Sequence, residues 1–195
     1  MDVDGSLVEM AKVKVSTRSK ENHAVWAGAG ILAIATGETS VRIWDLKTDD
    51  NFVLPSAGGT SSEVISSMSF CNEKNILAAG TNAGTVLMWR YPSNRLRPTD
   101  EDWKALPKVP IGPTIRTLSW GGGNRYLAIN CVRQVFVLTE QELAVGYCDG
   151  VSAIQQTPSQ VLVKFHGNKS SSMSTEVTSK LDLPIQGTIQ YEYLF

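Results

Sequence analysis

The stretch SVRIW, residues 40–44, returns twice along the chain, as TVLMW at residues 85–89 and as QVFVL at residues 134–138. Each stretch is a run of five residues in which β-branched, aromatic and other large apolar side chains dominate, which predicts a β-strand. Successive stretches end 45 and then 49 residues apart. Repetition at this period is typical of a chain built from repeated structural units.

A second apolar run precedes each of these strands, as LAIAT from Leu32, LAAGT from Leu77 and LAINC from Leu127. Nearly continuous small apolar residues are typical of a strand that is covered on both faces, and five residues between turns are too few for a helix. An aromatic residue lies before each run, at Trp26, Phe70 and Trp120. Four strands per repeat, joined by tight turns, are the pattern of one propeller blade.

The dipeptide Trp44-Asp45, with the LAIAT run shortly before it, resembles the signature of WD40 repeats. The second repeat keeps the tryptophan but has Arg90 in the place of the aspartate, and the third repeat has lost the dipeptide. The resemblance implies an all-β, incomplete WD40-type β-propeller with three recognisable four-stranded blades and a partial fourth. The residues expected to define the repeats, with the tryptophans packed in the core, are Trp26, Trp44, Asp45, Phe70, Trp89, Trp120 and Leu138.

We expect four regions along the chain. Residues 1–22 are a basic segment that includes a candidate first strand, and residues 23–140 hold the three degenerate blades. Residues 141–166 are expected to form an outer strand and a partial fourth blade. Residues 167–195 read as a Ser/Thr-rich loop and an atypical C-terminus. Because propellers typically close with four to eight blades, the open blade faces are expected to depend on a partner or on further blades.

Residues 12–140 also resemble the WD40 part of a subunit family of intraflagellar transport complex A, large proteins with propellers followed by helical repeats. Since nothing matches the helical repeats, the chain is expected to be a propeller piece. The resemblance implies a non-catalytic scaffold that works with the other complex A subunits in retrograde ciliary transport and cilium assembly, at the cilium and basal body. An alternative is a WD40 scaffold of another assembly, such as a vesicle coat or a ubiquitin-ligase adaptor.

The charge balance argues against several classes of partner. The chain has 195 residues, of which 18 are basic and 19 are acidic. A net charge of −1 gives no electrostatic basis for non-specific binding to nucleic acid. The longest uncharged stretch, residues 22–37, falls short of the roughly 20 apolar residues that cross a bilayer. The first ten residues lack the apolar core of a signal peptide, so we expect a cytoplasmic protein.

Motifs for bond chemistry are weak in this sequence. The three cysteines lie far apart, so we expect neither a disulfide nor a zinc site, and no metal or cofactor. The glycine clusters at residues 28–30 and 121–123 precede strands rather than helices, which favours hairpin turns over a phosphate-binding loop. A remote alternative is a hydrolase that uses His166 with a nearby serine, although a solvated histidine at a strand end is the favoured interpretation.

One interruption of the repeat is a candidate for partner binding. The stretch YPSNRLRPTDED, residues 91–102, holds two prolines and changes from basic to acidic along its length, which predicts a long surface loop. Trp103 follows it and has no counterpart in the other repeats, so it is either a binding anchor or an aromatic packed on the blade edge. The candidate partner contacts are Trp103, Arg95 and Arg97.

Overall fold

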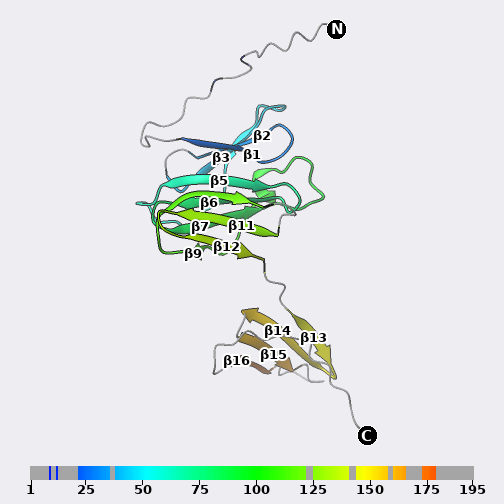
Figure 1. Ribbon diagram of the computed structural model, residues 1–195. Coiled ribbons are helices and arrows are strands. Elements are labelled where there is room, and N and C mark those ends of the chain that lie inside the picture. The colour runs from blue at the N-terminus through cyan, green and yellow to red at the C-terminus, as the bar shows by residue number, and fades with distance from the viewer. Residues whose placement is uncertain are drawn as a thin grey trace. The chain divides into compact units, whose positions relative to one another are not determined.

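The chain is built almost entirely from β-strands in the computed structural model (Figure 1). The structure describes residues 9, 12, 22–35, 38–121, 125–140, 144–157, 160–165 and 173–178. Within them the strands form four antiparallel sheets, and the one helical segment is a single 3₁₀ turn. The all-β prediction is therefore confirmed. Two compact units, Met1–Thr139 and Glu140–Phe195, divide the chain.

The first sheet, blade 1, has four strands that follow one another in chain order: β1 (His23–Trp26), β2 (Ile31–Ala35), β3 (Val41–Asp45) and β4 (Asn51–Val53). The short turn before β2 holds two glycines in the left-handed region, where a side chain would be strained. This turn matches the prediction that the glycine cluster at residues 28–30 forms a hairpin.

The second sheet, blade 2, begins in the same way and ends with two short outer strands. It contains β5 (Ile65–Cys71), β6 (Ile76–Thr81), β7 (Thr85–Arg90), β8 (Lys104–Ala105) and β9 (Val109–Pro110). Both β8 and β9 pair with β7, each over two residues. The outer edge of blade 2 is therefore divided between two segments.

Blade 3 has three strands: β10 (Ile115–Trp120), β11 (Tyr126–Cys131) and β12 (Val135–Thr139). In blades 1 and 2 the third strand has partners on both sides, and in blade 3 β12 pairs with β11. The expectation of an outer strand and a partial fourth blade in residues 141–166 stays a prediction.

The second unit consists of one four-stranded sheet: β13 (Val145–Cys148), β14 (Val151–Thr157), β15 (Gln160–Phe165) and β16 (Met173–Thr178). β13 pairs with β14 across the Asp149-Gly150 turn, in which both residues have a positive φ, as a tight hairpin requires. A strand also occupies residues 173–178, where a loop was expected.

Two hydrophobic cores lie within the first unit, one between blades 1 and 2 and the other between blades 2 and 3. β6 is buried along its whole length, as its small apolar residues predict. β11 differs, because Ala128 and Asn130 on its second face are exposed while Leu127 and Ile129 are buried. The LAINC run was expected to be covered on both faces, but within the first unit no described blade covers the second face of blade 3.

Serine side chains of β5 join blade 2 to blade 3. The backbone amides of Leu118 and Trp120, on the edge of β10 that faces away from β11, donate to the hydroxyls of Ser67 and Ser69, at 3.1 and 3.2 Å. The Ser66 hydroxyl donates to the carbonyl of Ile115, at 2.6 Å. Because unpaired strand edges are costly when buried and sticky when exposed, these hydroxyls stabilise the inner edge of β10.

A buried carboxylate stabilises the segment that leads from blade 1 into blade 2. Glu63 Oε1 accepts hydrogen bonds from the amide and the hydroxyl of Thr60, at 3.2 and 3.0 Å. Burial would raise the pKa of Glu63. The Thr60 amide, the hydroxyls of Thr81 and Thr60 and the charge of Lys108 outweigh it, so the pKa lies below its ordinary value. Nearby, the indole of Trp89 donates to the carbonyl of Pro55, at 2.7 Å.

Candidate interaction surface

The loop of residues 92–102 lies between β7 and β8 and is closed by two aromatic side chains. Tyr91, before the loop, contacts Trp103, after it, in an edge-on arrangement with ring centroids 4.7 Å apart. Tyr91 also stacks on Phe70 of β5, and its hydroxyl donates to the carbonyl of Ala27 in blade 1, at 3.4 Å. Burial raises the pKa of the Tyr91 hydroxyl. Both ends of the loop are therefore fixed to the core.

Trp103 is 1% exposed, so the prediction that it contacts a partner directly is wrong. The alternative interpretation, packing on the blade, describes its position. The 3₁₀ turn of Asp100–Asp102 (η1) comes directly before it and reverses the chain. A large apolar ring that can reach the core is more stable there than in water, because burying it removes a large apolar area from solvent. Trp103 supports the loop from inside.

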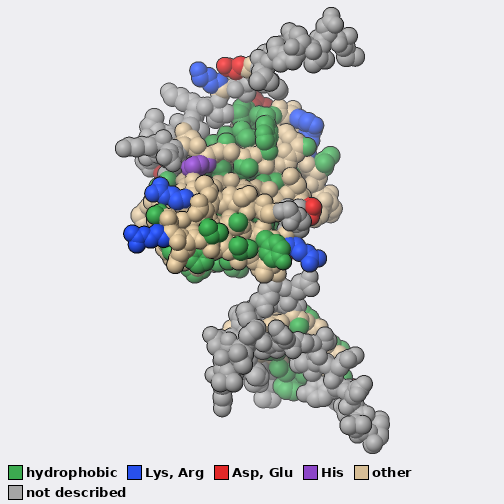
Figure 2. All heavy atoms as spheres, in the orientation of Figure 1, with side chains coloured by type: hydrophobic (Ala, Val, Ile, Leu, Met, Phe, Trp, Pro, Cys, Tyr) green, Lys and Arg blue, Asp and Glu red, His purple; other side chains and the backbone are tan. Residues whose placement is uncertain are grey.

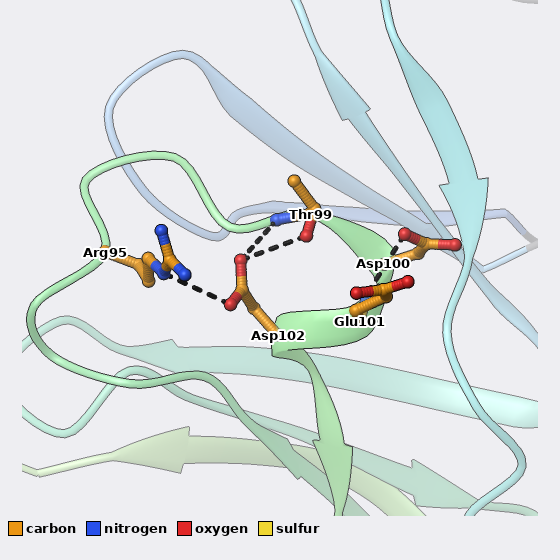
Figure 3. Close-up of polar contacts among 5 residues, drawn as sticks. All are labelled: Arg95, Thr99, Asp100, Glu101 and Asp102. Atoms are coloured by element: carbon orange, nitrogen blue, oxygen red, sulfur yellow. Dashed lines mark hydrogen bonds and ion pairs between the residues drawn. The ribbon is translucent and has the colours of Figure 1, made fainter.

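Asp102 organises the interior of the loop (Figure 3). Its Oδ2 accepts hydrogen bonds from the amide and the hydroxyl of Thr99, at 2.9 and 3.1 Å, and its Oδ1 lies 3.2 Å from Nε of Arg95. The hydrogen bond from the Thr99 amide is the largest effect on the pKa of Asp102. It acts with the Thr99 hydroxyl and the charges of Arg95 and Lys104, and together they lower this pKa despite an opposing effect of desolvation.

The tip of the loop presents an apolar side chain between two cationic ones. Leu96 is 83% exposed, and its neighbours Arg95 and Arg97 are exposed as well. A turn in which the Arg95 amide donates to the Pro92 carbonyl, at 3.1 Å, carries this tip. Sequence reasoning named the two arginines and missed Leu96. The sequence signal for Leu96 was a single leucine between two arginines in a segment with two prolines.

The repeat-defining residues lie in different environments. Trp89 is 1% exposed, while Phe70, Trp120 and Leu138 are partly buried against the cores. Trp44 is partly buried as well, and its indole donates to Asp49 Oδ1, at 2.9 Å. The remaining member of the dipeptide, Asp45, accepts from the amide of Lys47 in its own turn, at 2.9 Å.

Trp26 is 57% exposed, so its expected core packing is wrong. Alternation along β1 turns Val25 toward the core between blades 1 and 2 and turns Trp26 to the other face. There it lies opposite Leu32 of β2, which lies opposite Trp44 of β3. Repeat register alone could not show that this face has no neighbouring blade among the described sheets of the first unit.

Blade 3 also exposes a face, which we call the blade 3 outer face. Its exposed apolar residues are Tyr126, Val135 and Val137 on the strands and Val132 in the turn between them, with exposed fractions from 52% to 68%. Hydrophobic side chains reach the surface over β11 and β12 (Figure 2). Exposed apolar patches of this kind mark interaction surfaces.

The residues expected for catalysis or metal binding can be checked only in the described part of the chain. His166, the histidine of the hydrolase alternative, lies outside them. No group of three or more His, Cys, Asp or Glu side chains that could hold a metal ion occurs among the described residues. In the same part of the chain, no helix has both the length and the apolar character needed to cross a membrane.

A family model described as the IFT140 first beta-propeller matches residues 1–141. Among solved structures, the chain is similar to a chain of the mitotic checkpoint complex, with 10% identity and a TM-score of 0.48 over 62% of this chain and 37% of that one. The chain is also similar to the C-terminal WD40 domain of Sif2, with 16% identity and a TM-score of 0.47 over 61% of this chain and 33% of that one. A third similar structure is Raptor from Chaetomium thermophilum, with 18% identity and a TM-score of 0.43 over 78% of this chain and 16% of that one. The chain thus spans less than half of the length of each of these three.

Proposed function

The chain belongs to the IFT140 first beta-propeller family, and from this membership we propose that it is a non-catalytic interaction platform in intraflagellar transport. The observation that carries the proposal is the family match over residues 1–141, which includes all three blades of the first unit. Propeller blades joined by cores and hydrogen bonds form a rigid support from which loops reach other proteins. The work of such a protein is binding.

The proposed partners are the other subunits of intraflagellar transport complex A. The place of action is the cilium and its basal body, where the complex serves retrograde transport and cilium assembly. The family name supports this assignment over the vesicle-coat and ubiquitin-ligase alternatives, which no feature of the chain favours. The hydrolase alternative stays untested, because His166 lies outside the described residues.

Within this platform, the tip of the loop at residues 92–102 is the proposed partner contact. Leu96 supplies an apolar group, and Arg97 supplies a positive charge beside it. Arg95 contributes less, because its guanidinium is already paired with Asp102. The tip suits a partner with a small apolar pocket bordered by carboxylates. The two aromatic residues that close the loop limit the entropy that is lost when the tip binds.

We test this with the tagged full chain in an extract of ciliated cells, measuring recovery of complex A subunits. We expect recovery with the wild-type chain and a loss of about tenfold with Arg97→Glu, the size expected for a charge reversal at an interface. Leu96→Asp should have a similar effect. Arg125→Glu is the matched control, because Arg125 is exposed on another blade and undergoes the same charge change.

The outcomes separate the two parts of the proposal. If the wild-type chain recovers no complex A subunit, the ciliary assignment is wrong. If recovery is normal with both loop variants, the platform stands but the loop is not the contact. Circular dichroism of each variant should match the wild type, since both side chains are exposed.

A further inference from the structure

Thr99 is the one serine or threonine of the sequence that is followed by three acidic residues, Asp100, Glu101 and Asp102. Protein kinases select their substrates partly by charge patterns. A kinase with a basic substrate groove favours a hydroxyl that is followed by carboxylates, because the opposite charges are complementary. The pattern therefore makes Thr99 a candidate phosphate acceptor.

The hydroxyl of Thr99 lies at the exposed end of the loop of residues 92–102 (Figure 3). It donates to Oδ2 of Asp102, at 3.1 Å, in an exposed hydrogen bond. The backbone of Thr99 is extended, with φ −86° and ψ 176°, and the turn η1 that follows has three residues. The amide of Asp102 donates to the carbonyl of Thr99, at 3.2 Å, and closes this turn. Since such a short turn with exposed hydrogen bonds opens at little cost, a kinase can bind the segment in extended form.

We propose that an acidophilic protein kinase phosphorylates Thr99 and that the phosphate weakens partner binding at the tip of the loop. In the transfer, Oγ1 of Thr99 forms a bond to the γ-phosphorus of ATP while the bond from that phosphorus to the bridging oxygen of ADP breaks. ADP leaves, and the hydroxyl proton passes to a base of the kinase. The modification stands on its own chemistry, whereas its effect on binding rests on the proposed function.

Arg95 is placed to receive the phosphate. Its Nε lies 3.2 Å from Oδ1 of Asp102, and the other oxygen of the same carboxylate accepts the hydrogen bond from Thr99. A phosphate on Oγ1 removes the donated hydrogen and repels the carboxylate. The guanidinium then pairs with the phosphate, which offers more charge and three acceptor oxygens.

The phosphate also changes the charge of the loop beside Leu96. Residues 92–102 hold two arginines and three acidic residues, so their net charge is −1. A phosphate at neutral pH makes this charge about −3. Because Arg97 is only two residues from Thr99, the added negative charge counteracts the positive charge that was proposed to meet carboxylates of the partner. Phosphorylation should therefore release the partner.

Purified casein kinase 2, which selects acidic residues after its target, tests the modification on the folded full chain with ATP. Mass spectrometry of proteolytic peptides should locate the phosphate on Thr99. Thr99→Val should lose that phosphate and Thr99→Ser should keep it. The double variant Asp100→Asn/Glu101→Gln leaves Asp102 in place and should slow the transfer at least about tenfold. Glu73→Gln, at an exposed position of blade 2, is the control and should keep the wild-type rate.

The kinase assay can overturn the proposal in two ways. One is a folded chain that carries no phosphate on Thr99 after the reaction. The other is an unchanged rate in the double variant, which would show that the acidic residues do not direct the kinase.

Phosphorus NMR tests the contact with Arg95. The second ionisation of a phosphorylated hydroxyl has an ordinary pKa of about 6. This pKa should be lower in the phosphorylated wild type than in phosphorylated Arg95→Gln, because the guanidinium stabilises the dianion. Arg125→Gln, on another blade, should match the wild type. Equal pKa values in the wild type and Arg95→Gln would show that Arg95 does not pair with the phosphate.

Recovery of complex A subunits tests the regulation. The phosphorylated chain should recover about tenfold less than the unmodified chain, and phosphatase treatment should restore the recovery. Equal recovery by the two forms overturns the regulatory role. If the unmodified chain recovers no subunit, the proposed function and the regulatory role fail together, whereas phosphorylation of Thr99 is decided by the kinase assay alone.

Discussion

Trp103 shows how one buried side chain positions an exposed surface. It contacts Tyr91 across the base of the loop, so the exposed Leu96 is carried on a segment whose two ends are held together. The sequence placed Trp103 outside the repeat and left two interpretations open, a binding anchor or an aromatic packed on the blade edge, and its burial agrees with the second. Its role is to fix the loop, and the partner contact is proposed for the tip.

Trp103→Ala should lower the free energy of unfolding by about 3–5 kcal/mol, the usual cost of truncating a buried tryptophan. Trp103→Phe should cost less than about 2 kcal/mol, since it keeps an aromatic ring and the indole N–H has no hydrogen-bond partner among the described residues. Urea denaturation measures both. Leu96→Ala is the control, and a similar loss there would show that the burial of Trp103 is not the cause.

Glu63 is a second residue whose contribution to stability depends on its surroundings, here the hydrogen bonds that its carboxylate accepts. Its pKa is lowered in the folded chain from the ordinary value of 4.5, so the folded state binds fewer protons than the unfolded state in that range. The stability it contributes is fully present above pH 4.5 and is lost as the pH falls through the folded pKa. The charge therefore stabilises the blade 1 to blade 2 connection at neutral pH and not in acid.

Glu63→Gln should lower the free energy of unfolding by about 1–3 kcal/mol at pH 7, the range for hydrogen bonds to a charged group. The difference from the wild type should shrink below pH 4.5, as the Glu63 carboxylate binds a proton first in the unfolded chain and then, at lower pH, in the folded chain. Denaturation at a series of pH values measures this. Glu101→Gln, at an exposed position, should behave like the wild type, and a constant Glu63→Gln deficit down to pH 2.5 would contradict the explanation.

At the scale of elements, the blades pack closely because small residues lie where strands of neighbouring blades meet. A Cβ atom added at Gly80 of β6 would lie 2.5 Å from Cγ2 of Ile115, on β10. Glycine is required there by contact with the next blade, since its backbone is not in the left-handed region. The glycine of the LAAGT run therefore has a packing role in the structure.

Gly80→Ala should cost about 1–3 kcal/mol through overpacking. Ile115→Leu removes the Cγ2 methyl group, so the double variant Gly80→Ala/Ile115→Leu should be more stable than the sum of the single changes predicts. A double-mutant cycle in urea measures this coupling. Gly121→Ala is the control, because its nearest neighbour would be 3.6 Å away. Strict additivity of the two changes would exclude the proposed clash.

At the scale of the whole molecule, the first unit is a stack of three blades with an apolar face at each end. Trp26 and Val53 are exposed on blade 1, and Val135 and Val137 are exposed on blade 3. Blades gain stability from their neighbours, so exposed end faces favour association with other proteins or other blades. The proposed platform follows from this architecture, with the loop at residues 92–102 as its contact.

The sequence by itself determined the repeated strands of the three blades and the family, because periodic apolar runs and turn residues are local signals. It also located the loop at residues 92–102. Only the tertiary structure decided which side chains face a neighbour. Trp44 and Trp89 occupy matching repeat positions, yet Trp44 is only partly buried and Trp89 lies in the core between blades 1 and 2. Burial depends on what packs against a face, and neither repeat register nor residue type contains that information.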